Sequence, residues 1–462
     1  MDTVLAIDLG GSSLRAALME RDGRIVASAM RRHRLGEEAD ADGWWAMLVA
    51  AVAELPQSPV KAIIASGFTR SQVLVDGAGD PVRPAQCFAD TRATAEAAEL
   101  TGASRGTWVE MTPFHPAARL RWARAHDPDA FARARHVLQP KDFLVLRLTG
   151  RRASDRISNA WALERRGNVR ALALFRRAQL DAALLPELFD PWDIVGPCTG
   201  LAGYEGVPVM CGAMDTWCAS LGAGASQPGD AYLIAGTTDA GGVLSDAPAE
   251  TEGLVTLPWG IGLFHTGGPS GAGGDCLQWL AEVLGQPDVG TVVASAEGAV
   301  ANGNPLLFLP ALSGERAPSW AATSRGSFAG LDRSHGAAEL ARAVMEGVAF
   351  ADRDLLAGLP FDRLFLGGGG ARSDLWCQMR ADLLGCQVVR SSEQPGLVGA
   401  ALVAWAGLGA YPTLSAAQAA LSERAEVFWP DWTVIARYQR LFEVFKQLQA
   451  AAATLAHGLS RF

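Results

Sequence analysis

The chain has 462 residues, which is too long for one ordinary hydrophobic core, so we expect two domains of about 200 residues each. Hydrophobic residues make up 49% and charged residues 19% of the sequence, which excludes an intrinsically disordered chain. The net charge of −9 argues against a nucleic acid as partner. Seven cysteines without a CxxC pair fit neither a disulfide framework nor a zinc site. No signal peptide or membrane span is evident, and we expect a cytoplasmic protein.

A glycine-rich turn follows the first apolar run, Thr3 to Ile7. Asp8-Leu9-Gly10-Gly11-Ser12-Ser13 separates this run from a second one, Leu14 to Met19, and the pattern predicts a strand, a turn and a strand. A turn with two glycines and two hydroxyls can point several backbone N–H groups at phosphate oxygens. Asp8 at its mouth can hold Mg²⁺ directly or through water. An ordinary hairpin would show the same pattern.

A second turn of the same kind lies close to half the chain length later. Asp230 to Ala235 is apolar, Gly236-Thr237-Thr238-Asp239 follows, and a further strand-like run covers 240–244. Two such turns, each at the start of a similar half, indicate a duplicated domain whose paired turns grip a phosphate chain. We therefore place the domains at residues 1–227 and 228–462.

One carboxylate stands out at the end of the first half. Asp215 follows the apolar run that begins at Val207 and opens a segment of small and apolar residues. An Asp at this place is a favoured helix N-cap, and that is the simplest interpretation. The positive end of a helix would also keep the carboxylate ionised, as a catalytic base requires.

The rest of the chain alternates strands with helices. Polar residues follow the strand Lys61 to Ser66, as is typical of ligand sites in α/β folds. Four glycines, Gly367 to Gly370, precede a helix that we expect to end at Gly385. Further predicted segments are a strand and helix over 131–150, a helical stretch over 170–189, and helices over 275–285, 336–355, 375–384 and 434–455.

Several long segments, in the same order, resemble the FGGY family of carbohydrate kinases within the actin/hexokinase/Hsp70-like ATPase superfamily. They include Phe308 to Trp320 (FLPALSGERAPSW), Gly326 to Leu331, Leu340 to Phe350 (LARAVMEGVAF) and Gly367 to Gly385. Within the family the chain is most similar to xylulokinases. The resemblance implies an α/β fold of two ribonuclease-H-like domains facing each other across a cleft.

The implied activity is transfer of the γ-phosphoryl group of MgATP to a hydroxyl of a small sugar, such as the ketopentose xylulose. A linear polyol of the erythritol or glycerol type is the alternative acceptor. A nucleotide-dependent sugar-binding or sensor protein is the alternative from another class. The implied partners are small molecules, with neither nucleic acid nor membrane, and a homodimer is left open.

The resemblance also assigns roles to individual residues. Asp215 matches the catalytic base, and Asp8 the residue near Mg²⁺. The acceptor would be held by Thr69, Arg70, Asp215 and Thr216. The positions that match the two phosphate motifs, the nucleotide-lining residues and the adenosine motif are Gly10, Gly11, Ser12, Ser13, Arg15, Gly236, Thr237, Thr238, Gly274, Gln278, Gly369, Gly370, Ala371 and Asp374.

Five positions depart from the family pattern. Gly11 stands where Thr is commoner, and Thr216 replaces the Asn or Gln that usually follows the catalytic Asp. The bulky Trp217 comes next. Thr69-Arg70 matches neither the Met-His pair of xylulokinases nor the Arg-Glu pair of glycerol kinases. Because these departures gather at the acceptor end, the nucleotide part of the prediction is the more secure.

Overall fold

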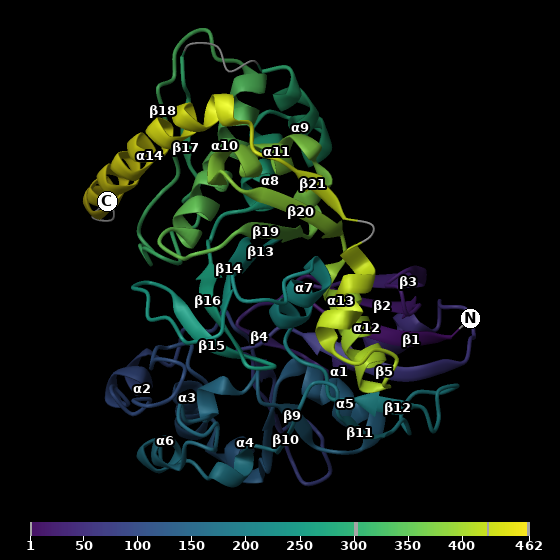
Figure 1. Cartoon of the computed structure of the whole chain (residues 1–462). Helices are drawn as coiled ribbons and strands as arrows, with labels where there is room; N and C mark the ends of the chain where they lie inside the picture. The colour runs from purple at the N-terminus through teal and green to yellow at the C-terminus, as the bar shows by residue number, and fades with distance from the viewer. Residues whose placement is uncertain (1, 300–303, 423–424, 460–462) are drawn as a thin grey trace. The chain divides into compact units, whose positions relative to one another are not determined.

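The computed structural model describes residues 2–299, 304–422 and 425–459 (Figure 1). The chain forms two compact units, and each draws on separate stretches of sequence. The first unit comprises Met1–Gly222, Leu257–Gly262 and Pro395–Leu421, and the second comprises Ala223–Thr256, Leu263–Gln394 and Ser422–Phe462. No helix in the described ranges is both long and apolar enough to cross a membrane.

The first unit is built on a six-stranded sheet with the order β11-β12-β5-β1-β2-β3. Strand β1 runs antiparallel to β2 and parallel to β5, and β5 is parallel to β12. The predicted strand, turn and strand at the N-terminus are therefore confirmed. The bounds are β1 Thr3–Leu9, β2 Ser13–Met19, β3 Ile25–Arg32, β5 Val60–Gly67, β11 Ile194–Pro197 and β12 Pro208–Met210.

Helices cover both faces of this sheet, which explains why β1 is apolar on both sides. Helices α1 (Ala41–Val52) and α5 (Pro140–Thr149) pack on the face that carries Leu5, Ile7 and Leu9. Helix α12 (Pro395–Gly407) lies along β1 and β5, as Figure 1 shows. Because successive side chains of a strand point to opposite faces, Asp8 faces away from the Leu5–Leu9 core.

The second unit repeats the plan. Its seven-stranded sheet has the order β15-β16-β14-β13-β19-β20-β21. Within it, β20-β19-β13-β14-β16 match β12-β5-β1-β2-β3 of the first unit in order and in direction, which confirms the duplicated α/β fold. The bounds are β13 Asp230–Ala235, β14 Asp239–Ser245, β15 Val255–Gly260, β16 Leu263–Pro269, β19 Arg363–Gly367, β20 Gln387–Ser392 and β21 Glu426–Phe428.

The helices expected in the second half are present within a few residues of their predicted ends. The predicted stop at Gly385 is also confirmed, because this glycine takes the left-handed conformation (φ 69°) after α11. The helices of this unit are α8 Gly274–Val283, α9 Val289–Glu297, α10 Ala337–Leu356, the short 3₁₀ helix η3 Gly369–Arg372, α11 Asp374–Leu384 and α14 Trp432–Leu459. One short strand pair is formed by β17 Leu307–Leu309 and β18 Ser327–Ala329.

A smaller helical layer with its own core is inserted in the first unit after β5. The helical stretch expected over 170–189 is wrong in part, because α6 (Leu172–Arg177) stops before Gln179, whose φ is 52°, and Pro186 precedes a strand. The remaining elements of the unit are β4 Glu38–Ala39, β6 Val73–Val75, β7 Ala85–Gln86, α2 Thr94–Glu99, α3 Pro116–His126, α4 Pro128–Arg133, β8 His136–Leu138, β9 Ala153–Asp155, η1 Ala160–Ala162, η2 Ala182–Leu184, β10 Glu187–Phe189, α7 Asp215–Ala223 and α13 Leu414–Ser422.

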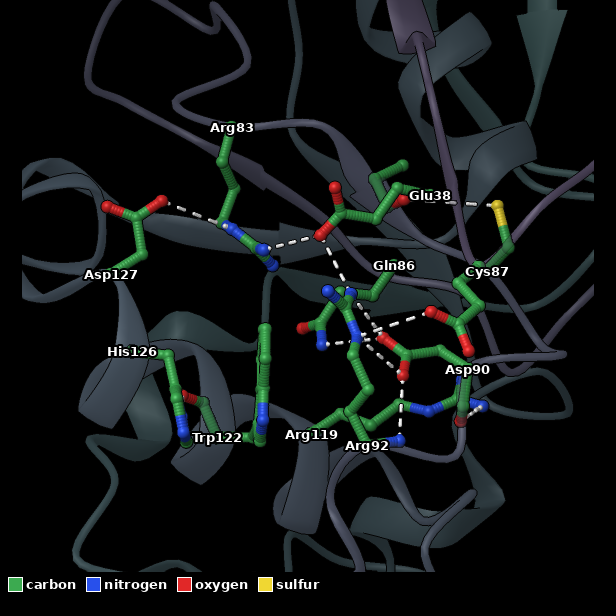
Figure 2. A network of polar contacts seen from close by, with 12 residues as sticks. Glu38, Arg83, Gln86, Cys87, Asp90, Arg92, Arg119, Trp122, His126 and Asp127 are labelled. Atoms are coloured by element: carbon green, nitrogen blue, oxygen red, sulfur yellow. Dashed lines mark hydrogen bonds and ion pairs between the residues drawn. The ribbon is translucent and has the colours of Figure 1, made fainter.

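A buried arginine on α3 ties this layer to the end of β5. Arg119 is fully buried and donates to the backbone carbonyls of Arg70, Phe88 and Asp90, the last two at 2.9 and 2.7 Å. Burial lowers the pKa of Arg119 to about 10, so the side chain still carries its charge at neutral pH. Figure 2 shows Arg119 beside the Asp90 segment. The guanidinium of Arg119 thus holds the loop after β5 and the loop after β7 through their backbone carbonyls.

The same segment is held from its other side by a chain of ion pairs (Figure 2). Arg92 donates to Asp90 at 2.8 Å and to Glu38 at 2.7 Å, and Arg83 also donates to Glu38, at 2.8 Å. The Arg92 guanidinium lies 4.1 Å from the ring centre of Trp122 on α3. Such a network restrains the loop after β7 more than one exposed pair would.

We predict that Arg119→Met lowers the free energy of unfolding by about 2–5 kcal/mol, because it leaves three carbonyls without their charged donor. Arg124→Met is the matched control, since Arg124 is exposed on the same helix and donates to one carbonyl, that of Gln179; its expected loss is below about 0.5 kcal/mol. Urea unfolding measures both. Equal losses for the two variants would contradict the anchoring role of Arg119.

Candidate functional site

Three neighbouring parallel strands of the first unit end at one edge of the sheet, and the predicted catalytic residues lie there. Asp8 is near the end of β1, Thr69 and Arg70 follow β5, and Asp215 follows β12. A bridge between Gly67 and Met214 continues the pairing of β5 and β12 past their ends. Carboxyl ends of parallel strands are the usual place for ligands in open α/β sheets. The sheet therefore brings these four residues together.

Asp8 is held on three sides. The hydroxyl of Ser66 on β5 donates to its Oδ1 at 3.0 Å, and Arg15 is its cross-strand neighbour on β2. A Cβ atom at Gly396, in the first turn of α12, would lie 2.7 Å from its Oδ2. Burial raises the pKa of Asp8, while Ser66 and Arg15 lower it. The sequence reasoning missed Gly396, since its closeness to Asp8 arises only from the fold.

Asp215 is the first residue of α7 and is partly buried. The backbone N–H of Thr216 donates to its Oδ1 at 2.7 Å, and the Thr216 hydroxyl does so at 3.2 Å. Burial, and then the nearby charge of Asp8, raise the pKa of Asp215 to about 6. A carboxylate with this pKa is ionised at neutral pH and still takes a proton readily. Asp215 is thus the first residue of the helix rather than its N-cap, and its role as base stays a prediction.

Two glycines fix how α7 crosses α12. A Cβ at Gly399 would lie 1.7 Å from the carbonyl oxygen of Cys218, and one at Gly222 would lie 1.9 Å from that of Pro395. Neither position has room for a side chain, so the helix backbones are in direct contact. Trp217 has a structural role: it is fully buried and donates from Nε1 to the carbonyl of Trp259 at 2.6 Å. It does not line the small cavity described below.

The first glycine turn is a tight hairpin between β1 and β2. Gly10 N–H donates to the carbonyl of Ser13 at 2.9 Å, and the ring Nε2 of His33 lies 3.0 Å from the Gly10 carbonyl. A Cβ at Gly11 would meet the ring of Phe88 at 3.6 Å, an ordinary contact distance. The fold would accept the commoner Thr there, so the structure gives no reason for this departure.

A small cavity of about 40 Å³ lies beside the β5 and β12 ends. Thr69, Arg70 and Met214 form one side of it, and Thr69 Oγ1 lies 4.0 Å from Met214 Sδ. Arg70 has a left-handed backbone (φ 56°), which the bond from Arg119 to its carbonyl holds. The lining also includes residues that the sequence reasoning did not single out, among them His115, Gln139, Ser158 and Trp161.

In the second unit the turn Gly236 to Thr238 receives the N-terminus of α8. Gly274 N–H donates to the Gly236 carbonyl at 2.9 Å, and Asp275 N–H donates to the Thr237 carbonyl at 3.0 Å. A Cβ at Gly273 would lie 2.7 Å from the Thr237 carbonyl oxygen. The predicted second phosphate turn and Gly274 are thus one compact structure. Gln278, one turn further on, is exposed and donates to Glu282 at 3.0 Å.

The four glycines Gly367 to Gly370, at the end of β19 and directly after it, lead to the end of β13. A Cβ at Gly368 (φ 92°) would lie 2.5 Å from the Ala235 carbonyl oxygen, and one at Gly370 would lie 2.7 Å from the Ala235 Cβ. Gly369 has open space around its Cα, and Ala371 is buried. The glycine run therefore packs against the end of β13 and leaves one position open. Asp374 instead pairs with Arg390 at 2.8 Å.

A buried ion triad lies behind the second turn. Arg380 on α11 donates to Asp239 at 2.8 Å and to Asp352 at 2.9 Å, and all three side chains are fully buried. Asp239 directly follows Thr238, so the ion pairs of the triad hold the backbone at the end of the turn in place. The sequence offered no signal for Arg380, which sits among apolar residues of a helix. In the described part of the chain, no three His, Cys, Asp or Glu side chains gather as a metal cage.

Comparison with known proteins identifies the family of the chain. Residues 3–222 match the N-terminal domain, and residues 231–408 the C-terminal domain, of the FGGY family of carbohydrate kinases. The chain is 31% identical to the xylulose kinase of Escherichia coli strain K12 over 428 residues, covering 83% of this chain and 85% of that protein. It is 33% identical to the xylulose kinase of Klebsiella pneumoniae over 426 residues, with the same coverage.

A solved structure agrees with this placement. The crystal structure of xylulose kinase from Rhodospirillum rubrum matches with a TM-score of 0.85 and 29% identity, over 98% of this chain and 100% of that one. Both domain matches, the duplicated sheets and the two glycine turns lead to one conclusion: the chain belongs to the FGGY family of carbohydrate kinases.

Proposed function

We propose that this carbohydrate kinase transfers the γ-phosphoryl group of MgATP to a hydroxyl of a ketopentose, with xylulose as the best candidate. The observation that carries the proposal is Asp215, a carboxylate with a pKa of about 6 that follows a strand end and directly follows Met214, which lines a small cavity. The identity of the acceptor is supported by the xylulose kinases of Escherichia coli and Klebsiella pneumoniae, to which the chain is similar.

The base has a defined task in this reaction. As the acceptor oxygen attacks the phosphorus, its proton must leave, and Asp215 takes it. The bonds from the N–H and hydroxyl of Thr216 hold the Asp215 carboxylate in one orientation before the reaction begins. Thr69 and Arg70 would hold the acceptor at the side of the cavity next to Met214.

The nucleotide and its ion fit the chemistry of the two turns. Asp8 is a buried carboxylate whose ionisation is opposed by burial, so a divalent cation beside it would stabilise the charged form. MgATP supplies the phosphoryl group and the charge that neutralises it during transfer. In the first unit, Gly10, Gly11, Ser12, Ser13 and Arg15 would bind phosphate oxygens through one hairpin.

The second unit supplies the remaining nucleotide contacts in this proposal. Gly236, Thr237 and Thr238 would bind phosphate, and Gly274 and Gln278 would line the nucleotide. The open position at Gly369, with Gly370 and Ala371, suits a flat adenine ring against bare backbone. Asp374 is the weakest of these assignments, because its carboxylate pairs with Arg390.

The proposal also covers the cellular location and the partners of the protein. All seven cysteines are free thiols, six of them buried, which is compatible with a reducing cytoplasm. Small-molecule sugars are the proposed partners, and a second copy of the chain as partner stays a prediction. A linear polyol is the second candidate acceptor, and the Arg70 side chain, which neither subfamily has at its place, is the reason to test it.

The acceptor is tested by ADP release from purified protein with MgATP and single ketopentoses, ketohexoses or polyols. We expect D-xylulose to raise ADP release at least about 100-fold over the sugar-free rate, since an acceptor hydroxyl is needed for transfer. A greater kcat/KM for erythritol or glycerol than for any ketopentose would identify a polyol as the acceptor. Sugar binding without any ADP release would favour a sensor.

We predict that Asp215→Asn lowers kcat at least about 100-fold while KM for the sugar changes little, because the proton acceptor is lost and the shape is kept. Asp129→Asn is the control, since this carboxylate is exposed in the first turn of α4 and has no part in the proposed site; its kcat should stay within about threefold. A kcat for Asp215→Asn within a few-fold of the wild type would exclude Asp215 as the base.

The raised pKa of Asp215 also affects stability. Between its ordinary value of 3.8 and about 6, the folded protein binds a proton that the unfolded chain releases, so folding stability falls as pH rises through this window. In Mg²⁺-free buffer, Asp215→Asn should therefore melt at a higher temperature than the wild type at pH 8. The difference should shrink toward pH 5. A wild type that melts higher at pH 8 would contradict the buried-charge account.

A further inference from the structure

A histidine that is not among the predicted phosphate-binding residues holds the first glycine turn. His33 follows β3, and its ring Nε2 lies 3.0 Å from the carbonyl oxygen of Gly10. The backbone N–H of His33 donates to the carbonyl of Ser12, also at 3.0 Å. Gly10 N–H closes the turn by donating to the carbonyl of Ser13 at 2.9 Å. Two of these three bonds therefore come from one residue at the end of the next strand of the sheet.

The bond from the His33 ring has one possible direction. A carbonyl oxygen only accepts, so the proton of the neutral ring must lie on Nε2. The other ring nitrogen, Nδ1, is buried, and no hydrogen bond reaches it within the part of the chain that the structure describes. Burial lowers the pKa of His33, and the bond to Gly10 opposes that shift. The ring is therefore a neutral donor at pH 7 that points at a single carbonyl.

This bond fixes the peptide plane between Gly10 and Gly11. In a trans peptide the C=O and the following N–H point in opposite directions, so the Gly11 N–H points away from the His33 ring. Gly11 is exposed, and no acceptor for its N–H is present among the described residues. An exposed N–H without an acceptor can donate to a phosphate oxygen, whereas an exposed carbonyl would repel it. The orientation of this plane thus decides whether this part of the turn attracts phosphate.

Two consecutive glycines allow this plane to turn over. A peptide flip reverses the C=O and the N–H, and it drives the residue at position 11 to a positive φ, which glycine tolerates and other residues resist. In the structure neither Gly10 nor Gly11 has a left-handed backbone. A Cβ at Gly11 would meet Phe88 at an ordinary 3.6 Å, so a residue that hinders the flip would fit there. Because glycine occupies the position, the plane depends on a restraint from outside the turn.

We infer that His33 is a positioning residue of this kinase: its bond to the Gly10 carbonyl keeps the Gly11 N–H turned outward to receive a phosphate group of the nucleotide. The inference rests on the proposed function and deepens it, since it names the residue that prepares the first phosphate turn. In this role His33 needs no contact with the nucleotide. It removes an alternative orientation of the turn in advance, so binding does not have to order the turn.

The test compares two amide side chains of different length. In His33→Gln the amide N–H can take the place of Nε2 and donate to Gly10, whereas in His33→Asn it is too short to reach. In calorimetric titration with Mg²⁺ and a non-hydrolysable ATP analogue, we expect His33→Asn to bind about 5- to 10-fold more weakly than the wild type, and His33→Gln to stay within about twofold. At saturating ATP, the KM for the sugar should be the same in both variants. Equal nucleotide affinity of the two variants would overturn the inference.

A double-mutant cycle with Gly11→Ala tests why the bond is needed. Ala hinders the flip without adding a hydroxyl, so the loss of affinity caused by His33→Asn should fall below about twofold in the Gly11→Ala background. An undiminished loss in that background would contradict the inference. His126→Asn is the matched control, because His126 is an exposed histidine that bonds a carbonyl of its own helix, that of Trp122. It should keep the wild-type nucleotide affinity, and melting temperatures show whether each variant folds.

NMR spectra of the protein without nucleotide separate this inference from the proposed function. The Gly11 amide should give one sharp signal in the wild type and in His33→Gln, and a doubled or exchange-broadened signal in His33→Asn. The same sharp signal in all three proteins would overturn the inference and leave the kinase proposal intact. The expected Gly11 signals without ADP release on any sugar would contradict the kinase activity alone.

Discussion

The constraint on which the site depends is the contact of α7 with α12 through glycine backbone. Gly222 and Gly399 leave no room for side chains between the two helices, so the helix backbones pack directly against each other. Asp215 begins α7, and Gly396, in the first turn of α12, touches Asp8. The two carboxylates are thereby close enough that the charge of Asp8 raises the pKa of Asp215. Burial is the larger cause of the raised pKa of Asp215, and the charge of Asp8 adds to it.

Burial of charge is the common theme of both units. In the first, Arg119 holds three carbonyls and shapes the loop that carries Arg70. In the second, Arg380 pairs with both Asp239 and Asp352 directly behind the turn Gly236 to Thr238. Buried ion pairs add little net stability, because desolvation offsets their attraction, but they impose one geometry. In this protein they lie behind the loops and turns that must keep their shape for a ligand.

Much of the fold could be predicted because its signals are local. The hairpin at Gly10 to Ser13, its repeat at Gly236 to Thr238 and the stop at Gly385 each follow from short patterns of glycine, hydroxyl and apolar residues. The mixed stretch over 170–189 was predicted as helical because its apolar residues did not reveal the breaks at Gln179 and Pro186. Helix α12 carries Gly396 to the side of Asp8, almost 400 residues away in sequence, and no local pattern encodes that contact.

Some residues of the candidate site could likewise be predicted from the sequence, and others could not. Asp8, Thr69, Arg70 and Asp215 could be singled out because they follow strands, and the parallel sheet brings strand ends together. His115, Gln139 and Ser158, which line the small cavity, could not, because they look like ordinary helix-start and loop residues in the sequence. Their place at the cavity is seen only in the folded structure.

The central claim, that Asp215 is a proton acceptor tuned by burial and by Asp8, is tested most directly by titrating its carboxyl carbon by NMR. The protein is free of Mg²⁺, and the wild type is compared with Asp8→Asn. The account predicts a pKa of about 6 in the wild type and a lower value in Asp8→Asn, because the repelling charge is gone. A pKa near the ordinary 3.8 in the wild type, or the same value in both proteins, would contradict it.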